Sequence, residues 1–164
     1  MKTMEADVIV VAAGPAGLAA ALELKHKGIE DILIVEREDK LGGILKQCIH
    51  DGFGLTRFKE TLSGPEYADR FIKEVKKEKI DYITDATVID VNNEKIVTAA
   101  TRDGLKQYKA KAVVLTMGCR ERTRGAISTP GTRPAGIYNA GVAQRYINLT
   151  NTMVGKKVVI LGSG

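Results

Sequence analysis

The segment from Ala12 to Gly17 is the part of the sequence whose residue types and spacing point most directly to chemistry. It reads Ala-Ala-Gly-Pro-Ala-Gly and fits the pattern G-x-G-x-x-G, except that alanine occupies the first glycine position. Backbone N–H groups in such a turn, with the N-terminus of the following helix, suit a pyrophosphate. We expect Gly14 to let the pyrophosphate approach and Gly17 to let helix and strand pack closely. Pro15 and Ala16 would open the helix.

Ala12 is the departure from the pattern. The first glycine serves a tight turn, and glycine takes backbone conformations that the Cβ atom of alanine disfavours. Alanine is the smallest replacement for glycine. We therefore expect Ala12 to weaken binding at the turn without abolishing it, and Ala12→Gly to tighten it.

A carboxylate follows the turn at the position where a nucleotide site needs one. Glu36 comes directly after the β-branched run Ile32–Val35. At the tip of a strand, such a carboxylate can accept hydrogen bonds from both ribose hydroxyls and would repel a 2′-phosphate. The alternative is an ordinary strand–helix–strand unit with a solvated glutamate. Up to Glu36 the pattern would serve NAD and FAD equally well.

The sequence assigns no catalytic residue, although five side chains are candidates. His50 could donate a hydrogen bond to a bound ring or substrate, or it could be structural or solvated. Cys48 and Cys119 form neither a CxxC pair nor a metal-ligand cluster, so we expect no metal site. Cys119 has no neighbouring histidine or second thiol to activate it, so a small buried residue is the simpler interpretation. Lys46 and Gln47 are comparable candidates to His50.

Three arginines, Arg120, Arg122 and Arg124, lie close together in the sequence after a predicted strand. They could hold a phosphate group or a domain contact, because the guanidinium fork suits both. A solvated loop is an equally good interpretation.

The elements around these residues form an α/β pattern. The run Val8–Val11, a helix over 15–27 and the run Ile32–Val35 predict a strand–helix–strand unit. An amphipathic helix from Gly64 to about Lys79 follows. Then come short extended segments separated by hairpin turn signals, which predict an antiparallel insertion: 80–84, 87–91, 95–101 and 105–109. Ala112–Thr116 returns to the parallel-strand pattern. We therefore predict a Rossmann-like fold, with a parallel sheet and an antiparallel β-meander insertion.

The last third of the chain is less regular. A helix is predicted from about Ala140 to Leu149, and residues 157–164 repeat the strand-then-glycine pattern of Val8–Gly14. We expect one nucleotide-binding domain over 1–150, and the start of a second nucleotide-binding domain over 151–164. A strand and half a turn cannot form a pyrophosphate site, because the helix N-terminus that stabilises phosphates is missing.

Composition and charge exclude several classes. Hydrophobic residues make up 44% of the 164 residues, and the net charge is +5. Basic residues alternate with acids, as in 70–79, which is typical of a solvated helix face, so we expect no nucleic-acid partner. The charge would suit an anionic ligand. We expect reduced thiols, no secretory leader and no membrane span, and therefore a cytoplasmic protein.

The sequence resembles the two-dinucleotide-binding flavoproteins of the pyridine nucleotide-disulfide oxidoreductase type. The resemblance rests on residues 8–21, on 35–37 with Gly42-Gly43, and on 112–118. It implies FAD at the first site, with Gly42 and Gly43 near the pyrophosphate and Val88 near the adenine. It also implies that Arg37 belongs to the cofactor site, and that the strand ending in Thr116, Met117 and Gly118 lies beside the flavin. This chain has Thr-Met-Gly where the family has Ala-Thr-Gly.

A closer resemblance is to the large-subunit flavoproteins of the opine oxidase and hydrogen cyanide synthase group, and to oxidoreductases linked with glycerol-3-phosphate metabolism. Residues 118–122, 130–131 and 136–144 carry it. It implies an enzyme that moves a hydride between NAD(P)H, FAD and a small amine, imine or polyol, with a partner subunit or a second copy. Disulfide reductases of the family have a cysteine pair near the position of Cys48, but the second cysteine is missing here.

A non-catalytic module that holds FAD or an adenine nucleotide for electron relay or assembly is the alternative function. In either case we expect the 164-residue chain alone to bind FAD at most. Hydride entry from NAD(P)H would need a complete second nucleotide domain.

Overall fold

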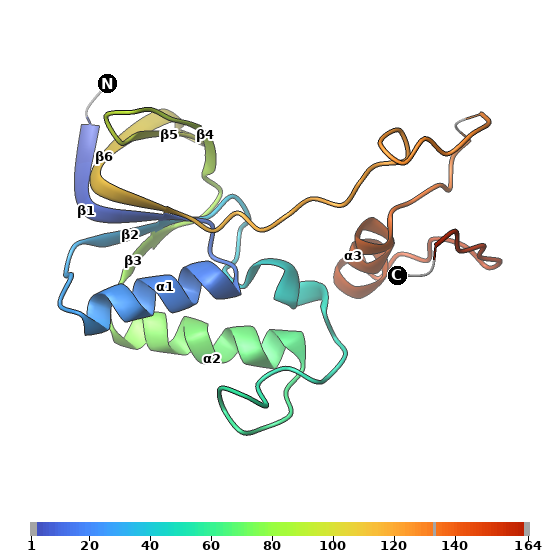
Figure 1. Ribbon diagram of the computed structural model, residues 1–164, viewed down its shortest axis with the longest axis horizontal. Helices are drawn as coiled ribbons and strands as arrows, with labels where there is room; N and C mark the ends of the chain where they lie inside the picture. The colour runs from blue at the N-terminus through green and yellow to red at the C-terminus, as the bar shows by residue number, and fades with distance from the viewer. Residues whose placement is uncertain (1–2, 133, 163–164) are drawn as a thin grey trace. The chain divides into compact units, whose positions relative to one another are not determined.

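The computed structural model describes residues 3–132 and 134–162 of the chain. The chain divides into two units, with the boundary between Gly118 and Cys119. Among the described residues, all six strands lie in the first unit, and their order in the sheet is β3-β2-β1-β6-β5-β4 (Figure 1).

The first unit opens with the predicted strand–helix–strand unit. β1 spans Thr3–Val11, α1 spans Pro15–His26 and β2 spans Ile32–Val35. The two strands run in parallel, with Val8 beside Ile32 and Val11 beside Val35. β-branched residues predominate in the paired stretches Val8–Val11 and Ile32–Val35, as expected where both faces of a sheet are covered. Pro15 suits the first turn of α1, because its missing N–H would have no partner inside the helix.

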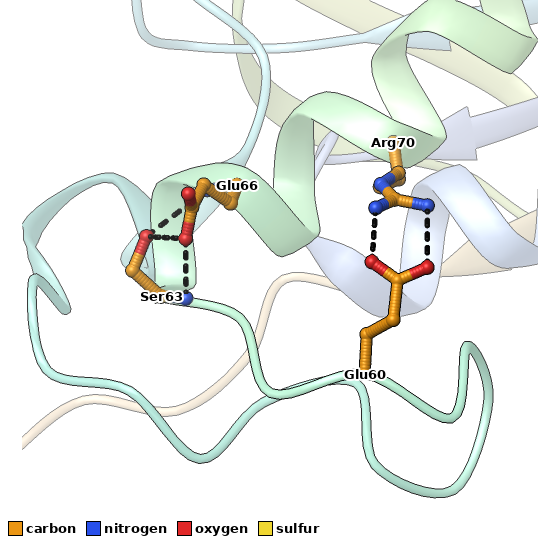
Figure 2. A network of polar contacts seen from close by, with 4 residues as sticks. All are labelled: Glu60, Ser63, Glu66 and Arg70. Carbon is orange, nitrogen blue, oxygen red and sulfur yellow. Dashed lines mark hydrogen bonds and ion pairs between the residues drawn. The ribbon is translucent and has the colours of Figure 1, made fainter.

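The helix α2 spans Gly64–Lys77 and ends two residues before the predicted position. It begins with a capping box: the Ser63 hydroxyl accepts from the N–H of Glu66, and the Glu66 carboxylate accepts from the N–H of Ser63 (Figure 2). This pair satisfies backbone donors that a helix leaves free at its start. The buried residues of α2 include Phe71 and Val75, which belong to the same core cluster as the buried residues of α1.

The segment after α2 is a third parallel strand. β3 spans Asp81–Ile83 and pairs with β2, with Leu33 beside Asp81 and Val35 beside Ile83. The assignment of 80–84 to the antiparallel insertion is therefore wrong. The segment is too short for its sequence pattern to reveal its direction, whereas α2 supplies the helical crossover that parallel pairing needs.

The β-meander is present, but its last strand is longer than predicted. β4 spans Thr87–Val91, β5 spans Ile96–Thr101 and β6 spans Gly104–Leu115. β4 with β5 and β5 with β6 pair in antiparallel fashion. The predicted strands over 105–109 and 112–116 are one continuous strand, because β1 begins at Thr3 and pairs in parallel with β6 from Gln107 onward. β6 thus joins the meander to the parallel sheet.

Two buried clusters cover the two faces of this sheet. Helices α1 and α2 pack on one face, where Val10, Leu22 and Phe71 belong to one core cluster (Figure 1). The other cluster joins Ile9 of β1 to the meander residues Val97 and Tyr108. The meander therefore supplies the apolar cover that the helices supply on the opposite face.

The segment between β2 and α2 is irregular but well packed. A short helix, η1, spans Gly43–Gln47, and Phe53 forms an isolated antiparallel bridge with Leu62. The Phe58 ring meets the rings of Tyr67 and Phe71 edge-on, at 5.5 and 5.6 Å between centroids.

An ion pair between Glu60 and Arg70 fastens the same segment to α2, with the two oxygens of the carboxylate facing the two terminal nitrogens of the guanidinium (Figure 2). Aromatic and charged contacts thus hold a stretch whose sequence shows little periodicity.

The second unit contains one helix among the described residues, α3, spanning Ala140–Thr150. Its start agrees with the sequence prediction. The Glu121 carboxylate accepts a hydrogen bond from the N–H of Gly141 in the first turn of α3, at 2.9 Å to each oxygen.

Residues 157–162, where the pattern predicts a strand, form none, and the Val159 side chain is 97% exposed. Ser163 and Gly164, the last residues of that repeated pattern, lie outside the described residues.

Candidate FAD site

The turn between β1 and α1 is built on a left-handed alanine. Ala12 has φ of 77°, in the region that glycine adopts without strain and alanine rarely adopts. Its N–H donates to the carbonyl of Val35 at 2.8 Å, and the carbonyl of Ala13 accepts from the N–H of Gly42 at 2.9 Å. The turn is thus tied to the end of β2 and to the start of η1.

Gly17 has no room for a side chain. A Cβ atom there would lie 2.0 Å from the carbonyl oxygen of Ala12 and 2.7 Å from Oγ1 of Thr116. Helix α1 therefore crosses directly over the turn, as the sequence analysis expects of this glycine. The close approach brings the N-terminus of the helix to the carboxyl end of β1.

Gly14 has the opposite environment. A Cβ atom there would have nothing within 4 Å, and the backbone is extended, with φ of −72° and ψ of −178°. Gly14 is also the N-cap of α1, and no side chain caps this helix start. Because the first N–H groups of a helix have no partner within it, this end of α1 offers donors and a positive dipole toward open space.

Glu36 lies at the end of β2 and is almost fully buried, at 3% exposure. Its Oε2 atom accepts from the N–H of Ala13 at 2.6 Å, and its Oε1 atom accepts from the N–H of Glu38 at 2.9 Å. A solvated surface glutamate is thus the wrong interpretation. Each carboxylate oxygen has a further lone pair for a hydroxyl donor. Arg37 is exposed, and its Nε lies 3.8 Å from the Glu38 carboxylate.

Gly42 and Gly43 abut the turn from the other side. Both have positive φ, 114° and 57°, and a Cβ atom on Gly43 would lie 2.7 Å from the Cα atom of Gly14. Two glycine segments from different parts of the chain therefore lie back to back at the start of α1. The position of Gly42 and Gly43 beside the turn is expected only from the family resemblance, because the residue pattern of the loop does not predict where it lies.

The remaining proposed cofactor residues lie on the meander and at the end of β6. Val88 is half-buried on β4 and packs against the core cluster that contains Val35. Met117 is 62% exposed, just after β6, and Gly118 has φ of 69°. The hydroxyl of Thr116, in contrast, lies at the turn, 2.7 Å from the carbonyl oxygen of Val11.

The catalytic candidates of the first unit occupy the segment after the glycine pair. The Cys48 thiol lies 3.4 Å from the carbonyl oxygen of Ile44, and Gln47 is buried at 5% exposure. The His50 ring is exposed and tilted against Phe53, with 5.2 Å between ring centroids.

Lys46 donates to the carbonyl of Lys40 at 2.9 Å. Among the described side chains of the whole chain, no three metal-binding groups cluster.

The arginine candidates belong to the second unit. Arg120 and Arg122 are exposed. Cys119 is exposed too, so its interpretation as a small buried residue is wrong. The guanidinium of Arg124 donates to the carbonyls of Pro130, Gly131 and Thr132 at 2.8 to 3.1 Å. Arg124 therefore closes its own loop, which favours a structural role over a phosphate contact.

Two contacts of the site have little signal in the sequence. The N–H of Ala13 binds Glu36, although the residue type at this position carries no information about a backbone donor. The Thr116 hydroxyl reaches the turn across 104 positions of sequence. The strand order explains both contacts, because it places β2 on one side of β1 and β6 on the other.

Residues 6–164 match the model of the pyridine nucleotide-disulphide oxidoreductase family. The chain belongs to that family. Proteins of this pyridine nucleotide-disulphide oxidoreductase family generally bind FAD and NAD(P)H. The resemblance on which the sequence analysis relied is confirmed, as is the fold class with its parallel sheet and meander.

Curated relatives are distant and longer than the chain. An opine oxidase subunit from Agrobacterium tumefaciens is 27% identical, with 96% of this chain and 32% of the relative aligned. Hydrogen cyanide synthase subunit HcnB of Pseudomonas protegens is 27% identical, with 98% of this chain and 34% of the relative aligned. Thioredoxin reductase of Bacillus subtilis is 29% identical, with 96% of this chain and 46% of the relative aligned. The chain thus spans about a third to just under half of the length of these relatives.

Solved structures support the fold. L-Proline dehydrogenase from P. horikoshii aligns with a TM-score of 0.72 at 20% identity, covering 95% of this chain and 31% of that one. Thioredoxin reductase from Streptococcus pyogenes aligns with a TM-score of 0.58 at 23% identity, covering 74% of this chain and 38% of that one. Within the described part of the chain, no helix is long and apolar enough to cross a membrane.

Proposed function

We propose that the first unit binds FAD, and that the chain is the FAD-binding part of an oxidoreductase that passes a hydride between NAD(P)H, FAD and a small substrate. The open space at Gly14, in front of an uncapped helix start, is the observation that carries the proposal. A pyrophosphate is an anion of the kind that such a helix end stabilises. The residues present therefore fit the cofactor of the family.

The proposed roles follow from the geometry of the turn. The N–H groups at the start of α1 would hold the pyrophosphate, and the remaining lone pairs of Glu36 would accept from the ribose hydroxyls. Gly43 keeps the approach to Gly14 free of a side chain, whereas Gly42 allows close packing against Lys46 and Ala68. Arg37 and Val88 would border the adenosine end, with Met117 and Gly118 toward the flavin. A bound flavin accepts and returns a hydride, and the protein supplies binding, orientation and exclusion of water.

The nature of the substrate is proposed by analogy with relatives. The distant relatives include a subunit of opine oxidase and a subunit of hydrogen cyanide synthase. We propose a small amine, imine or polyol substrate and a partner subunit or second copy. Cys48 and Cys119 are both free, which supports a reducing, cytoplasmic setting. Cys48 has no second cysteine beside it, so the proposal does not include the dithiol chemistry of disulfide reductases.

We propose that residues 151–164 open a second, NAD(P)-binding domain. The run Val158–Leu161 repeats the β-branched pattern of Val8–Val11, yet within the described residues it pairs with no strand, and its side chains are exposed. Such a strand needs a sheet to become buried. The proposal places the nicotinamide nucleotide outside the first unit.

Equilibrium titration of the purified 164-residue chain with FAD, NAD and NADP tests the proposed ligand. We expect FAD to bind at least about tenfold more tightly than NAD, and NADP to bind most weakly because Glu36 repels its 2′-phosphate. Retention of flavin absorbance through gel filtration is the accompanying readout. Tighter binding of NAD than of FAD would overturn the assignment.

A further inference from the structure

The side chain of Thr116 makes an unusual contact for a residue at the end of β6. Its Oγ1 atom lies 2.7 Å from the carbonyl oxygen of Val11 and 3.0 Å from that of Ala12. It would also be 2.7 Å from a Cβ atom placed on Gly17. The hydroxyl therefore sits between the end of β1, the turn and the first residues of α1, and it points at backbone carbonyls of the turn.

Ala12 is the residue in this turn whose conformation needs support. Its φ of 77° brings the Cβ atom of an L-residue into steric conflict with its own backbone, whereas glycine has no such penalty. The Ala12 N–H is held by Val35. Its carbonyl oxygen, packed closely beneath Gly17, shares the single hydroxyl hydrogen of Thr116 with the carbonyl oxygen of Val11. The Thr116 hydroxyl thus bridges the peptide units before and after Ala12, whose relative orientation is set by the backbone of Ala12.

We propose that Thr116 is a positioning residue that holds Ala12 in its left-handed conformation and so offsets the strain of alanine at the first position of the turn. This proposal rests on FAD binding at the turn. Thr116 acts through the turn and does not touch FAD. It strengthens FAD binding by raising the fraction of molecules in which the N–H groups of α1 have the binding geometry. The family resemblance implies that this strand end lies beside the flavin, whereas the Thr116 hydroxyl contacts the turn that we propose for the pyrophosphate.

A consequence distinguishes this role from ordinary packing. If glycine replaced Ala12, the left-handed conformation would be accessible without support, and loss of the hydroxyl would matter less. Thr116 and Ala12 should therefore be energetically coupled. A threonine that merely filled space would have the same effect with either residue at position 12.

A double-mutant cycle on the full 164-residue chain tests the coupling. The variants are Ala12→Gly, Thr116→Val and the double variant, with Thr116→Ser to restore a hydroxyl without the methyl group. We expect Thr116→Val to weaken FAD binding about three- to tenfold when Ala12 is present, the usual size for one hydrogen bond, and less than about twofold when glycine is present. Thr116→Ser should keep wild-type affinity to within about twofold.

Urea unfolding without FAD is the second readout, and it does not depend on the ligand. The Thr116→Val variant should unfold at lower urea than wild type with Ala12, and the gap should shrink with glycine at position 12. Thr98→Val on β5 is the control, because Thr98 faces Gln107 in the meander, and its effect should be equal in both backgrounds.

The outcomes separate this proposal from the proposed function. FAD binding by wild type with equal effects of Thr116→Val in both backgrounds, or failure of serine to restore affinity, would overturn the positioning role. If no variant binds FAD, the proposed function fails, while the unfolding cycle still decides whether Thr116 supports Ala12.

Discussion

At the scale of single residues, the site depends on buried polar contacts that hold one strained turn. Glu36 receives backbone hydrogen bonds from Ala13 on the turn and from Glu38 on its own segment. A carboxylate can accept at both oxygens, which an amide cannot. Glu36 therefore shapes the site before any nucleotide arrives, in addition to its proposed contact with ribose.

Replacing Glu36 with glutamine should weaken both the fold and the ligand contact. The amide NH₂ group would face a backbone N–H of Ala13 or Glu38 and leave it without an acceptor. We expect Glu36→Gln to lower the free energy of unfolding by about 1.5–3 kcal/mol without ligand and to weaken FAD binding. Urea denaturation and FAD titration measure the two effects. Glu94→Gln, in an exposed turn, is the matched control. Wild-type values in both measurements would show that the carboxylate is dispensable.

A methyl group at Gly17 should destabilise the chain even without ligand. The added Cβ atom would lie 2.0 Å from the Ala12 carbonyl oxygen, so helix and turn must separate. We expect Gly17→Ala to reduce the free energy of unfolding by about 1–3 kcal/mol, the usual cost of overpacking. The urea midpoint measures this change. A midpoint equal to that of wild type would mean that α1 does not cross the turn this closely.

The residues of the turn were predictable from sequence to different degrees. Gly14, Gly17 and Glu36 follow from a spacing rule, because a strand, a tight turn and a helix must meet in a fixed geometry. The left-handed conformation of Ala12 follows from the glycine that it replaces. The hydroxyl of Thr116 could not be predicted, since its partner lies 104 positions earlier and the contact depends on how β6 is registered against β1.

At the scale of elements, β6 and α2 position the site. β6 pairs with β5 over its first half and with β1 from Gln107 onward, so that Leu115 comes to lie beside Val11. Thr116 then follows at the edge of the turn. Helix α2 covers α1 and the loop that carries Gly42 and Gly43, and Ser63 and Glu66 define where α2 begins (Figure 2).

The capping box should contribute stability that depends on pH. A hydrogen bond from the backbone N–H of Ser63, and secondly one from its hydroxyl, hold the pKa of Glu66 below its ordinary value of 4.5; Ser63→Ala removes the second. A lowered carboxyl pKa stabilises the fold above the unfolded value, and the contribution is lost as the pH falls through the lower, folded value. We expect Ser63→Ala to reduce the free energy of unfolding by about 1 kcal/mol at pH 7. The difference from wild type should narrow as the pH falls below 4.5.

Urea denaturation of wild type and Ser63→Ala at pH 7 and at acidic pH provides the measurement. Thr61→Ala, two residues earlier in the exposed loop, is the control. A difference that grows at acidic pH would contradict the assigned direction.

Most elements could be predicted, and the errors have physical causes. Helices α1 and α2 and strand β2 have strong patterns, so their limits are nearly as predicted. β1, in contrast, begins at Thr3 and not at the predicted Val8, because its first residues pair with β6. β3 and the two halves of β6 were misjudged. Strand direction and continuity are set by partner strands, which a local pattern does not reveal. Residues 157–162 have a strand pattern but no partner strand among the described residues.

At the scale of the whole molecule, FAD binding should stabilise the first unit as one body. The site gathers residues from β1, α1, β2, η1 and the end of β6, so ligand contacts would connect distant parts of one sheet (Figure 1). A ligand that binds only the folded state adds about 2.7 kcal/mol at one hundred times its Kd. Hydrogen exchange should slow at residues 12–18 and 36–43, with the hairpin tip at 92–95 as an internal reference.

The central claim is that the open space at Gly14 receives the pyrophosphate of FAD, and Gly14→Ala tests it most directly. The added methyl group meets nothing within 4 Å, and the backbone is extended. The free energy of unfolding of the variant without ligand, measured with urea, should therefore stay within about 1 kcal/mol of the wild-type value. The methyl group would occupy the space in front of the helix N-terminus. FAD titration of Gly14→Ala should show affinity reduced about tenfold or more. A folded Gly14→Ala variant that binds FAD as tightly as wild type would contradict the account.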